Sequence, residues 1–329
     1  MLLPDLTDPR IAAIEVTPMW AGDLSIDDVD QALKDAGLPD ELLPPQPSRA
    51  KCMARAFHEC SPRGARIDSL PKGMGVTMSL KDVTKLDLEA LSAQAGIEVR
   101  EAASYHATFT AKILVQNING TEIETLQFTP DDHPMIPLVK ETYRVKRGQY
   151  KASEDLSVWF SQTIIPYVNG VGKRSRGGVY YVPASRARLI CDLAVALEAL
   201  SSSSQIDREV NGVKVPVHRL IHGGKLCIEP RFADDTAAME IMIDGVIRNT
   251  DSILDDLSSA LDPKEGKRLG KRALKTKADM CARLEAEMLQ WENVCSVSLD
   301  LLRNRIEEVR AAIGVAEMAA EMEDATKGE

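Results

Sequence analysis

The residues most suggestive of chemistry form one glycine-rich, positively charged loop, Gly170 to Gly178. Its glycines free the backbone to approach a phosphate group, and Lys173, Arg174 and Arg176 would supply positive charge. The loop is not a P-loop, because Tyr167 stands where that motif needs glycine and Arg174 where it needs a hydroxyl residue. It therefore predicts contacts to phosphate, with a solvated turn as the alternative.

Further cations and aromatic rings flank this loop in the sequence. Residues 137–190 hold ten basic side chains against three acidic ones, in a protein whose formal net charge is −10. Such mixtures suit phosphate contacts combined with base stacking. Tyr180 and Tyr181 are consecutive in an expected strand, so at most one of them should face the core. The candidate nucleic-acid contacts of this region are Arg144, Lys146, Arg147, Lys173, Arg174, Arg176, Tyr180 and Tyr181.

A second basic stretch occupies residues 264–277, with seven basic side chains and one acidic one. Spacings of three and four residues gather most of these cations on one broad helical face. That face would suit an anionic partner or the acidic face of a neighbouring subunit, and a solvated helix face is the alternative. The candidate nucleic-acid contacts here are Lys267, Arg268, Lys271 and Arg272.

No catalytic or metal-binding motif is recognisable in the chain. The six cysteines never form a Cys-x-x-Cys pair, which favours reduced thiols in a cytosol and disfavours a structural zinc site. His218 and His222 are four residues apart, but in an expected strand they would lie about 13 Å apart. We therefore expect neither metal nor cofactor, while an enzyme with an unrecognised site stays open as an alternative.

The composition predicts a globular protein outside the membrane. With 329 residues, the chain is long enough for two modest domains. No run approaches the roughly eighteen apolar residues that a spanning helix requires, and the first residues lack the pattern of a signal peptide. A cytoplasmic location is the expectation.

Two short helices are expected near the N-terminus. Ser25 should cap a helix from Ile26 to Ala36, and Ser48 should cap a second from Arg49 to Cys60. Between them, a long proline-rich connection disfavours a helix-turn-helix DNA reader, although the second helix has a basic side.

A β-hairpin is the clearest local prediction. Tyr105 to Asn117 alternates apolar and polar residues, as a half-buried strand does. Asn119-Gly120 then favours a type I′ turn into a return strand, Thr121 to Thr129. In that return strand the apolar residues shift from odd to even positions between Ile123 and Leu126, which predicts a bulge.

The middle of the chain alternates between helices and short strands. We expect a helix from Ser153 to Val168, a strand over Val179 to Val182 and a helix from Ala184 to Leu200. The serine run that follows would be a boundary or an excursion. A second small hairpin is expected beyond it, with strands at Val213 to Ile221 and Lys225 to Ile228 joined by His222-Gly223-Gly224.

The last hundred residues predict a long helical hairpin. Its first arm runs from Asp234 to Leu261, and its second from Lys264 past Met318, with Gly266, Gly270 and Gly314 as possible interruptions. The second arm is longer than the first, so it must bend or find another partner, and its apolar stripe would stay exposed unless another chain or domain covers it. This predicts a homo-oligomer whose interface includes Leu284, Met288, Trp291 and Leu302.

These elements together predict an α+β fold. N-terminal helices and an antiparallel hairpin body would be followed by a coiled-coil-like helical hairpin. The expected segments are an acidic helical segment at residues 1–60, an α+β body at 61–230 and the helical hairpin at 231–329.

Three short motifs carry a resemblance to a known family. They are Ala32-Leu33 with Leu38-Pro39, Leu42-Leu43-Pro44-Pro45 before the basic helix, and Gly177-Gly178-Val179-Tyr180-Tyr181-Val182-Pro183. In this order the chain resembles an uncharacterised family found in bacteriophage and plasmid genomes, over roughly residues 20 to 260. The resemblance implies a phage-infected or plasmid-bearing bacterium, and it implies no activity for any position.

Charge and architecture together predict a non-enzymatic accessory protein. It would bind nucleic acid or another polyanion through the cationic loop surface, and it would assemble through its helical hairpin. The alternative is a protein-binding adaptor or inhibitor that uses the same hairpin and basic patches.

Overall fold

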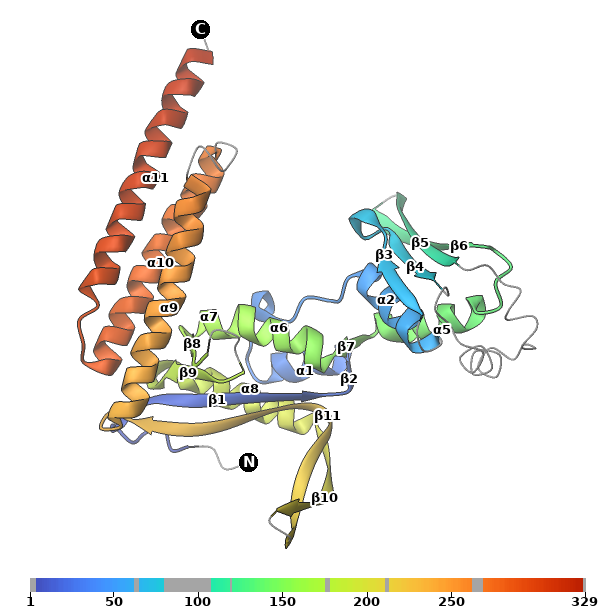
Figure 1. The fold of residues 1–329 in the computed structure, drawn as a ribbon, viewed down its shortest axis with the longest axis horizontal. Helices are drawn as coiled ribbons and strands as arrows, with labels where there is room; N and C mark the ends of the chain where they lie inside the picture. Colours follow the sequence, from blue (N-terminus) through green and yellow to red (C-terminus); the bar gives the residue numbers. More distant parts are fainter. Residues whose placement is uncertain are drawn as a thin grey trace. The chain divides into compact units, whose positions relative to one another are not determined.

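The computed structural model shows a mixed α+β protein with antiparallel sheets and three long C-terminal helices (Figure 1), as the sequence predicted. It describes residues 4–61, 65–79, 108–118, 120–174, 178–210, 213–261 and 269–327.

The chain forms two compact units. Unit 1 consists of Met1–Ala21, Ala32–Leu43 and Ser157–Glu329. Unit 2 consists of Gly22–Gln31 and Pro44–Leu156. These residue ranges differ from the three consecutive segments expected above. Each unit is made of separate stretches of the chain, because the chain returns to unit 1 after it has begun unit 2.

Unit 1 contains a five-stranded sheet in the order β10-β11-β1-β9-β8. At its centre is β1 (Ile11–Ala21), which pairs antiparallel with β11 (Val213–Phe232) and β9 (Tyr180–Pro183). The sequence did not predict β1, because residues 13–16 are all buried and leave no alternation of apolar and polar positions. The outer strands are β8 (Val171–Gly172) and β10 (Ser202–Val210).

The small hairpin expected at His222-Gly223-Gly224 was wrong. These residues lie inside the single long strand β11, which pairs antiparallel with β10 from Ser202–His222 to Val210–Val213. The glycines serve close packing: a Cβ on Gly223 would lie 2.3 Å from Ser201 Oγ, and one on Gly224 would lie 2.5 Å from the Trp20 ring. The serine run is likewise no boundary, because it leads into β10.

Helices cover the sheet of unit 1. The helix expected from Ser153 to Val168 is confirmed, and it contains two π-helical stretches. The helix expected from Ala184 is confirmed as α8, which contacts β11. The bounds here are Ala152–Leu156 (π, in unit 2), α6 (Ser157–Trp159), Phe160–Ile164 (π), α7 (Ile165–Tyr167), a 3-10 turn at Ala184–Arg186, α8 (Ala187–Ala199) and a 3-10 turn at Asp40–Leu42.

In the described part of the C-terminal region three helices stand where two arms were expected, and they can be followed in Figure 1. They are α9 (Thr236–Leu261), α10 (Lys271–Cys295) and α11 (Asp300–Lys327). The second arm ends at Ser296, whose φ of 54° places it in the left-handed region. The buried carboxylate of Glu292 holds the turn by accepting hydrogen bonds from the Leu299 amide (2.7 Å) and from Arg303 Nη2 (2.8 Å).

This break places the expected oligomer interface inside the protein. Leu284, Met288, Trp291 and Leu302 belong to a core that also includes α9 residues such as Met242. Because α11 folds back along α10, the apolar stripe is covered within one chain. Gly314 interrupts nothing in α11, whereas Gly270 precedes the first residue of α10; Gly266 lies outside the described residues.

Unit 2 is built on a four-stranded antiparallel sheet in the order β3-β4-β5-β6. The β5–β6 hairpin confirms the sequence prediction, but its register is unbroken from Thr110–Thr129 to Ile118–Thr121, so the expected bulge was wrong. The portion of the expected first strand before Thr108 lies outside the described residues. The bounds are β3 (Arg66–Ser69), a 3-10 turn (Pro71–Gly73), β4 (Gly75–Ser79), β5 (Thr108–Ile118) and β6 (Thr121–Thr129).

Two helices share the core of unit 2 with this sheet. They are α2 (Arg49–Cys60) and α5 (Ile136–Arg147). The N-cap of α2 is confirmed, because Ser48 Oγ accepts a hydrogen bond from the Lys51 amide. A short ladder joins β2 (Asp23–Ser25) to β7 (Gln149–Lys151), and the expected N-terminal helix follows β2 as α1 (Ile26–Asp35).

Candidate functional site

The glycine-rich loop is held in unit 1 between α7 and β9. Its first turn begins at Asn169, which has a φ of 54° and is followed by tightly packed Gly170. A Cβ on Gly170 would lie 3.0 Å from Ile165 Cγ2 and 3.2 Å from the carbonyl oxygen of Tyr181. A larger side chain here would therefore have to displace these neighbours by a few tenths of an ångström. Arg176, one of the candidate phosphate contacts, lies outside the described residues.

The C-terminal helices fix the position of this loop. Trp291 of α10 donates a hydrogen bond from Nε1 to the Asn169 carbonyl oxygen (2.9 Å). Gly245 of α9 lies against β8, where a Cβ would come within 3.0 Å of the Gly172 carbonyl oxygen. Trp291, expected at an oligomer interface, thus supports the cationic loop within its own chain.

Lys173 pairs with a carboxylate of the central strand. Its Nζ lies 3.1 Å from Glu15 Oε1, and Arg231 Nη2 lies 2.6 Å from Glu15 Oε2. Burial alone would raise the pKa of Glu15, but hydrogen bonds from Arg231 and Lys173 outweigh it and hold that pKa below its usual value. Lys173 therefore compensates a buried charge, and a phosphate would have to compete with Glu15 for it.

Both tyrosines of β9 are buried, so the expectation that at most one would face the core was wrong. The Tyr180 ring packs edge-on against Phe160, with centroids 5.8 Å apart. Tyr181 belongs to the core shared with the C-terminal helices, and Lys173 Nζ lies 5.7 Å from its ring centroid. The strand is covered on both faces, and the Tyr181 ring, at 1% exposure, is not free to stack on a base.

A pocket of about 550 Å³ lies beside the loop, and three arginines from three elements line it. Arg174 comes from the loop, Arg248 from α9 and Arg283 from α10. Hydroxyl and amide groups complete its polar lining, and one carboxylate, that of Glu287, faces it. The other lining residues are Ser161, Gln162, Ile165, Pro166, Gly170, Gly172, Tyr180, Gly245, Asn249, Ser252 and Ile253.

The three arginines differ in how they are held. Arg248 donates from Nη2 to the Lys173 carbonyl oxygen (3.3 Å), and its Nε lies 3.1 Å from Asp244. Arg283 Nε lies 3.3 Å from Glu287 Oε1. Arg174 is exposed and has no ion-pair partner among the residues that the structure describes. The pocket therefore presents guanidinium groups that can bind an anion.

The cations expected to join the loop from α5 belong to unit 2 instead. Lys146 is mostly buried between Asp23 (2.8 Å) and Glu59 (2.7 Å). Arg147 donates to the Pro47 carbonyl oxygen (3.5 Å), and Arg144 is exposed near Glu141 (3.8 Å). Lys146 is thereby neutralised within its own unit.

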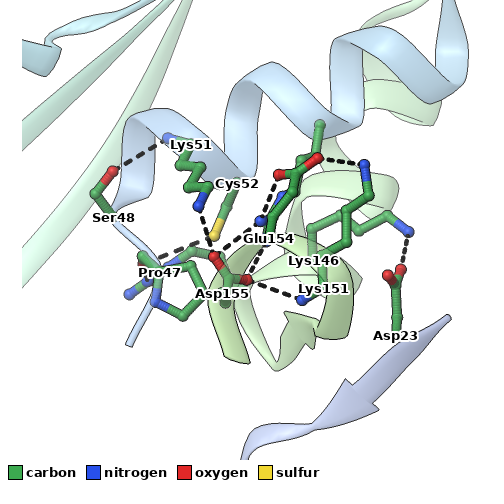
Figure 2. A network of polar contacts seen from close by, with 11 residues as sticks. Asp23, Pro47, Ser48, Lys51, Cys52, Lys146, Lys151, Glu154 and Asp155 are labelled. Atoms are coloured by element: carbon green, nitrogen blue, oxygen red, sulfur yellow. Dashed lines mark hydrogen bonds and ion pairs between the residues drawn. The ribbon is translucent and has the colours of Figure 1, made fainter. Parts of the chain in front are cut away.

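Figure 2 shows the polar network around these residues. At its centre is Asp155, which accepts hydrogen bonds from Lys51 Nζ (2.7 Å), Arg55 Nη1 (2.7 Å) and the Lys151 amide (2.8 Å). Burial alone would raise the pKa of Asp155, but these hydrogen bonds hold it below its usual value. Two cations of α2, Lys51 and Arg55, therefore compensate the buried carboxylate of Asp155.

The second basic stretch is only partly described. Lys267 and Arg268 lie outside the described residues, whereas Lys271 and Arg272 are exposed in the first turn of α10. Within the described part of the chain, no three His, Cys, Asp or Glu side chains gather as a metal site would require. No helix among the described residues could cross a membrane.

Sequence reasoning identified the loop with Arg174 but missed the two arginines that line the pocket with it. Arg248 and Arg283 lie on helices far along the chain, and nothing in their spacing links them to residue 174. Gly245 was the available signal, because a glycine inside a helix costs about 1 kcal/mol relative to alanine and so points to a packing reason for its presence.

These features define an α+β protein with a cationic pocket built around a glycine-rich loop. The chain belongs to the family of unknown function DUF6744, whose family model matches residues 21–324. No curated protein and no solved structure matches it. This match confirms the expectation that the chain belongs to an uncharacterised family.

Proposed function

We propose that this protein is a non-enzymatic accessory protein that binds nucleic acid through the pocket of unit 1. The observation that carries the proposal is the convergence of Arg174, Arg248 and Arg283 on one pocket beside a glycine-rich loop. A guanidinium group can donate two parallel hydrogen bonds to the oxygens of one phosphate, and it keeps its positive charge at every physiological pH. The protein as a whole is acidic, with a formal net charge of −10, so the positive charge of this pocket is a local feature and does not follow from the composition of the chain.

The dimensions of the pocket favour single-stranded over duplex nucleic acid. A volume of about 550 Å³ is in the range that accepts a small molecule, and one nucleotide is of that size. Serine, glutamine and asparagine side chains in the lining can supply further hydrogen bonds to phosphate and sugar. A nucleotide can enter such a pocket only when its base is unpaired.

The biological setting is part of the proposal. We propose the cytoplasm of a phage-infected or plasmid-bearing bacterium, and the support for it is the resemblance of the sequence motifs to a phage and plasmid family. The proposed function does not require self-association, because the side chains expected to mediate it belong to the core of unit 1.

Binding to a labelled single-stranded oligonucleotide, measured by fluorescence anisotropy, tests the proposal. Replacing Arg174 and Arg248 together with alanine should weaken binding at least tenfold, or about 1.4 kcal/mol, because two charged contacts to phosphate are lost. Arg188→Ala is the matched control: this arginine is exposed in unit 1 on α8, outside the pocket, and should leave the affinity unchanged. A wild-type protein that does not bind at low salt would favour the protein-binding adaptor instead.

A further inference from the structure

The pocket contains one carboxylate, which a site for phosphate alone would not need. Glu287 lies on α10, one turn after Arg283, and its side chain is only 15% exposed. Neither of its oxygens accepts a hydrogen bond from the described residues. Arg283 Nε is close enough for charge attraction, but its geometry is not that of a hydrogen bond.

Glu287 lines the pocket, and its side chain is not fully covered. A ligand in the pocket would have to use Oε2, because Oε1 is shielded from solvent and faces Arg283. Burial raises the pKa of Glu287, so its charged form lacks the solvation that an exposed carboxylate has. A ligand with an N–H donor would supply the missing hydrogen bond, whereas a bare phosphate would be repelled.

The surroundings of Glu287 suit a nucleobase. Ile165, Pro166 and Ile253 contribute apolar surface to the lining, against which a flat ring can pack. The amide groups of Gln162 and Asn249 can pair with the edge of a base. The arginines would hold the attached phosphate.

We infer that the pocket receives one unpaired base of a single strand, and that Glu287 accepts a hydrogen bond from the exocyclic amino group of that base. This inference rests on the proposed function and adds a base preference to it. Carboxylates accept hydrogen bonds from cytosine N4, whereas thymine presents a carbonyl oxygen at the same position. The pocket therefore prefers cytosine to thymine, two bases of nearly equal size.

The test compares oligo-dC and oligo-dT of about twelve nucleotides by fluorescence anisotropy at pH 8. The wild-type protein should bind oligo-dC about tenfold more tightly. Glu287→Gln should abolish this preference, because an amide can also donate to the thymine carbonyl. Glu285→Gln is the matched control, since this half-exposed residue lies two positions away on α10, pairs with Arg310 and does not line the pocket. Circular dichroism would establish that both variants fold.

Each outcome separates the two proposals. Equal wild-type affinity for both oligonucleotides would overturn the base preference and leave nucleic-acid binding standing. An undiminished preference in Glu287→Gln would also overturn it. Failure of the wild-type protein to bind either strand would overturn the proposed function itself.

Discussion

Leu284→Glu should unfold the C-terminal helices, and it should not convert an oligomer into monomers. Leu284 is 1% exposed in the core that α9, α10 and α11 share. Truncating such a leucine to alanine costs about 2–5 kcal/mol, and a glutamate there would in addition bury a carboxylate without a partner. We therefore expect the free energy of unfolding of unit 1 to fall by at least about 4 kcal/mol, which lies in the upper part of the range for leucine-to-alanine truncation.

Urea unfolding followed by circular dichroism, combined with light scattering, measures both possible effects. Leu289→Glu is the matched control, because Leu289 lies on the same helix but is 56% exposed. Its free energy of unfolding should change by less than about 0.5 kcal/mol. A folded Leu284→Glu protein with a smaller mass than wild type would show that this face joins two chains, and would contradict the three-helix arrangement.

Asp155→Asn should destabilise unit 2 by about 3 kcal/mol at neutral pH. The Asp155 side chain is only 6% exposed, and its partner Arg55 is 10% exposed. Removing one member of a buried ion pair leaves the other charge without compensation, which typically costs 3–5 kcal/mol. Glu154 also pairs with Arg55 and retains part of the compensation, so the lower end of that range applies.

The pH dependence of this effect follows from the direction of the pKa shift. Because the pKa of Asp155 is lower in the folded protein than in the unfolded chain, its contribution is complete above about pH 4. The contribution is lost as the pH falls through the folded-state value. The difference in unfolding free energy between wild type and Asp155→Asn should therefore shrink below pH 4, which urea titrations from pH 7 to pH 2 would show. A difference that stays constant would contradict the ion pairs of Asp155.

Local signals in the sequence were sufficient for several elements. Ser48 predicted the start of α2, because a serine oxygen can satisfy an open amide of the first turn. Asn119-Gly120 predicted the β5–β6 hairpin, because this dipeptide accepts the backbone angles of a two-residue turn. Each of these signals lies within a few residues of the feature that it predicts.

Features that depend on distant residues could not be predicted in this way. The strand β1 is covered on both faces, so its sequence carries no alternation. The break after α10 occurs at a serine in a left-handed conformation, where glycine or asparagine would have been the recognisable signal. Arg248 and Arg283 meet Arg174 only because the C-terminal helices pack against β8 and β9.

The salt dependence of single-strand binding tests the central claim most directly. If Arg174 and Arg248 each neutralise one phosphate, a plot of log K against log salt for the Arg174→Ala and Arg248→Ala double variant should be shallower than that of wild type. The expected reduction in slope is about 0.7 for each lost contact on single strands, or about 1.4 in total. Equal slopes for the two proteins would show that nucleic acid, if bound, does not contact this pocket.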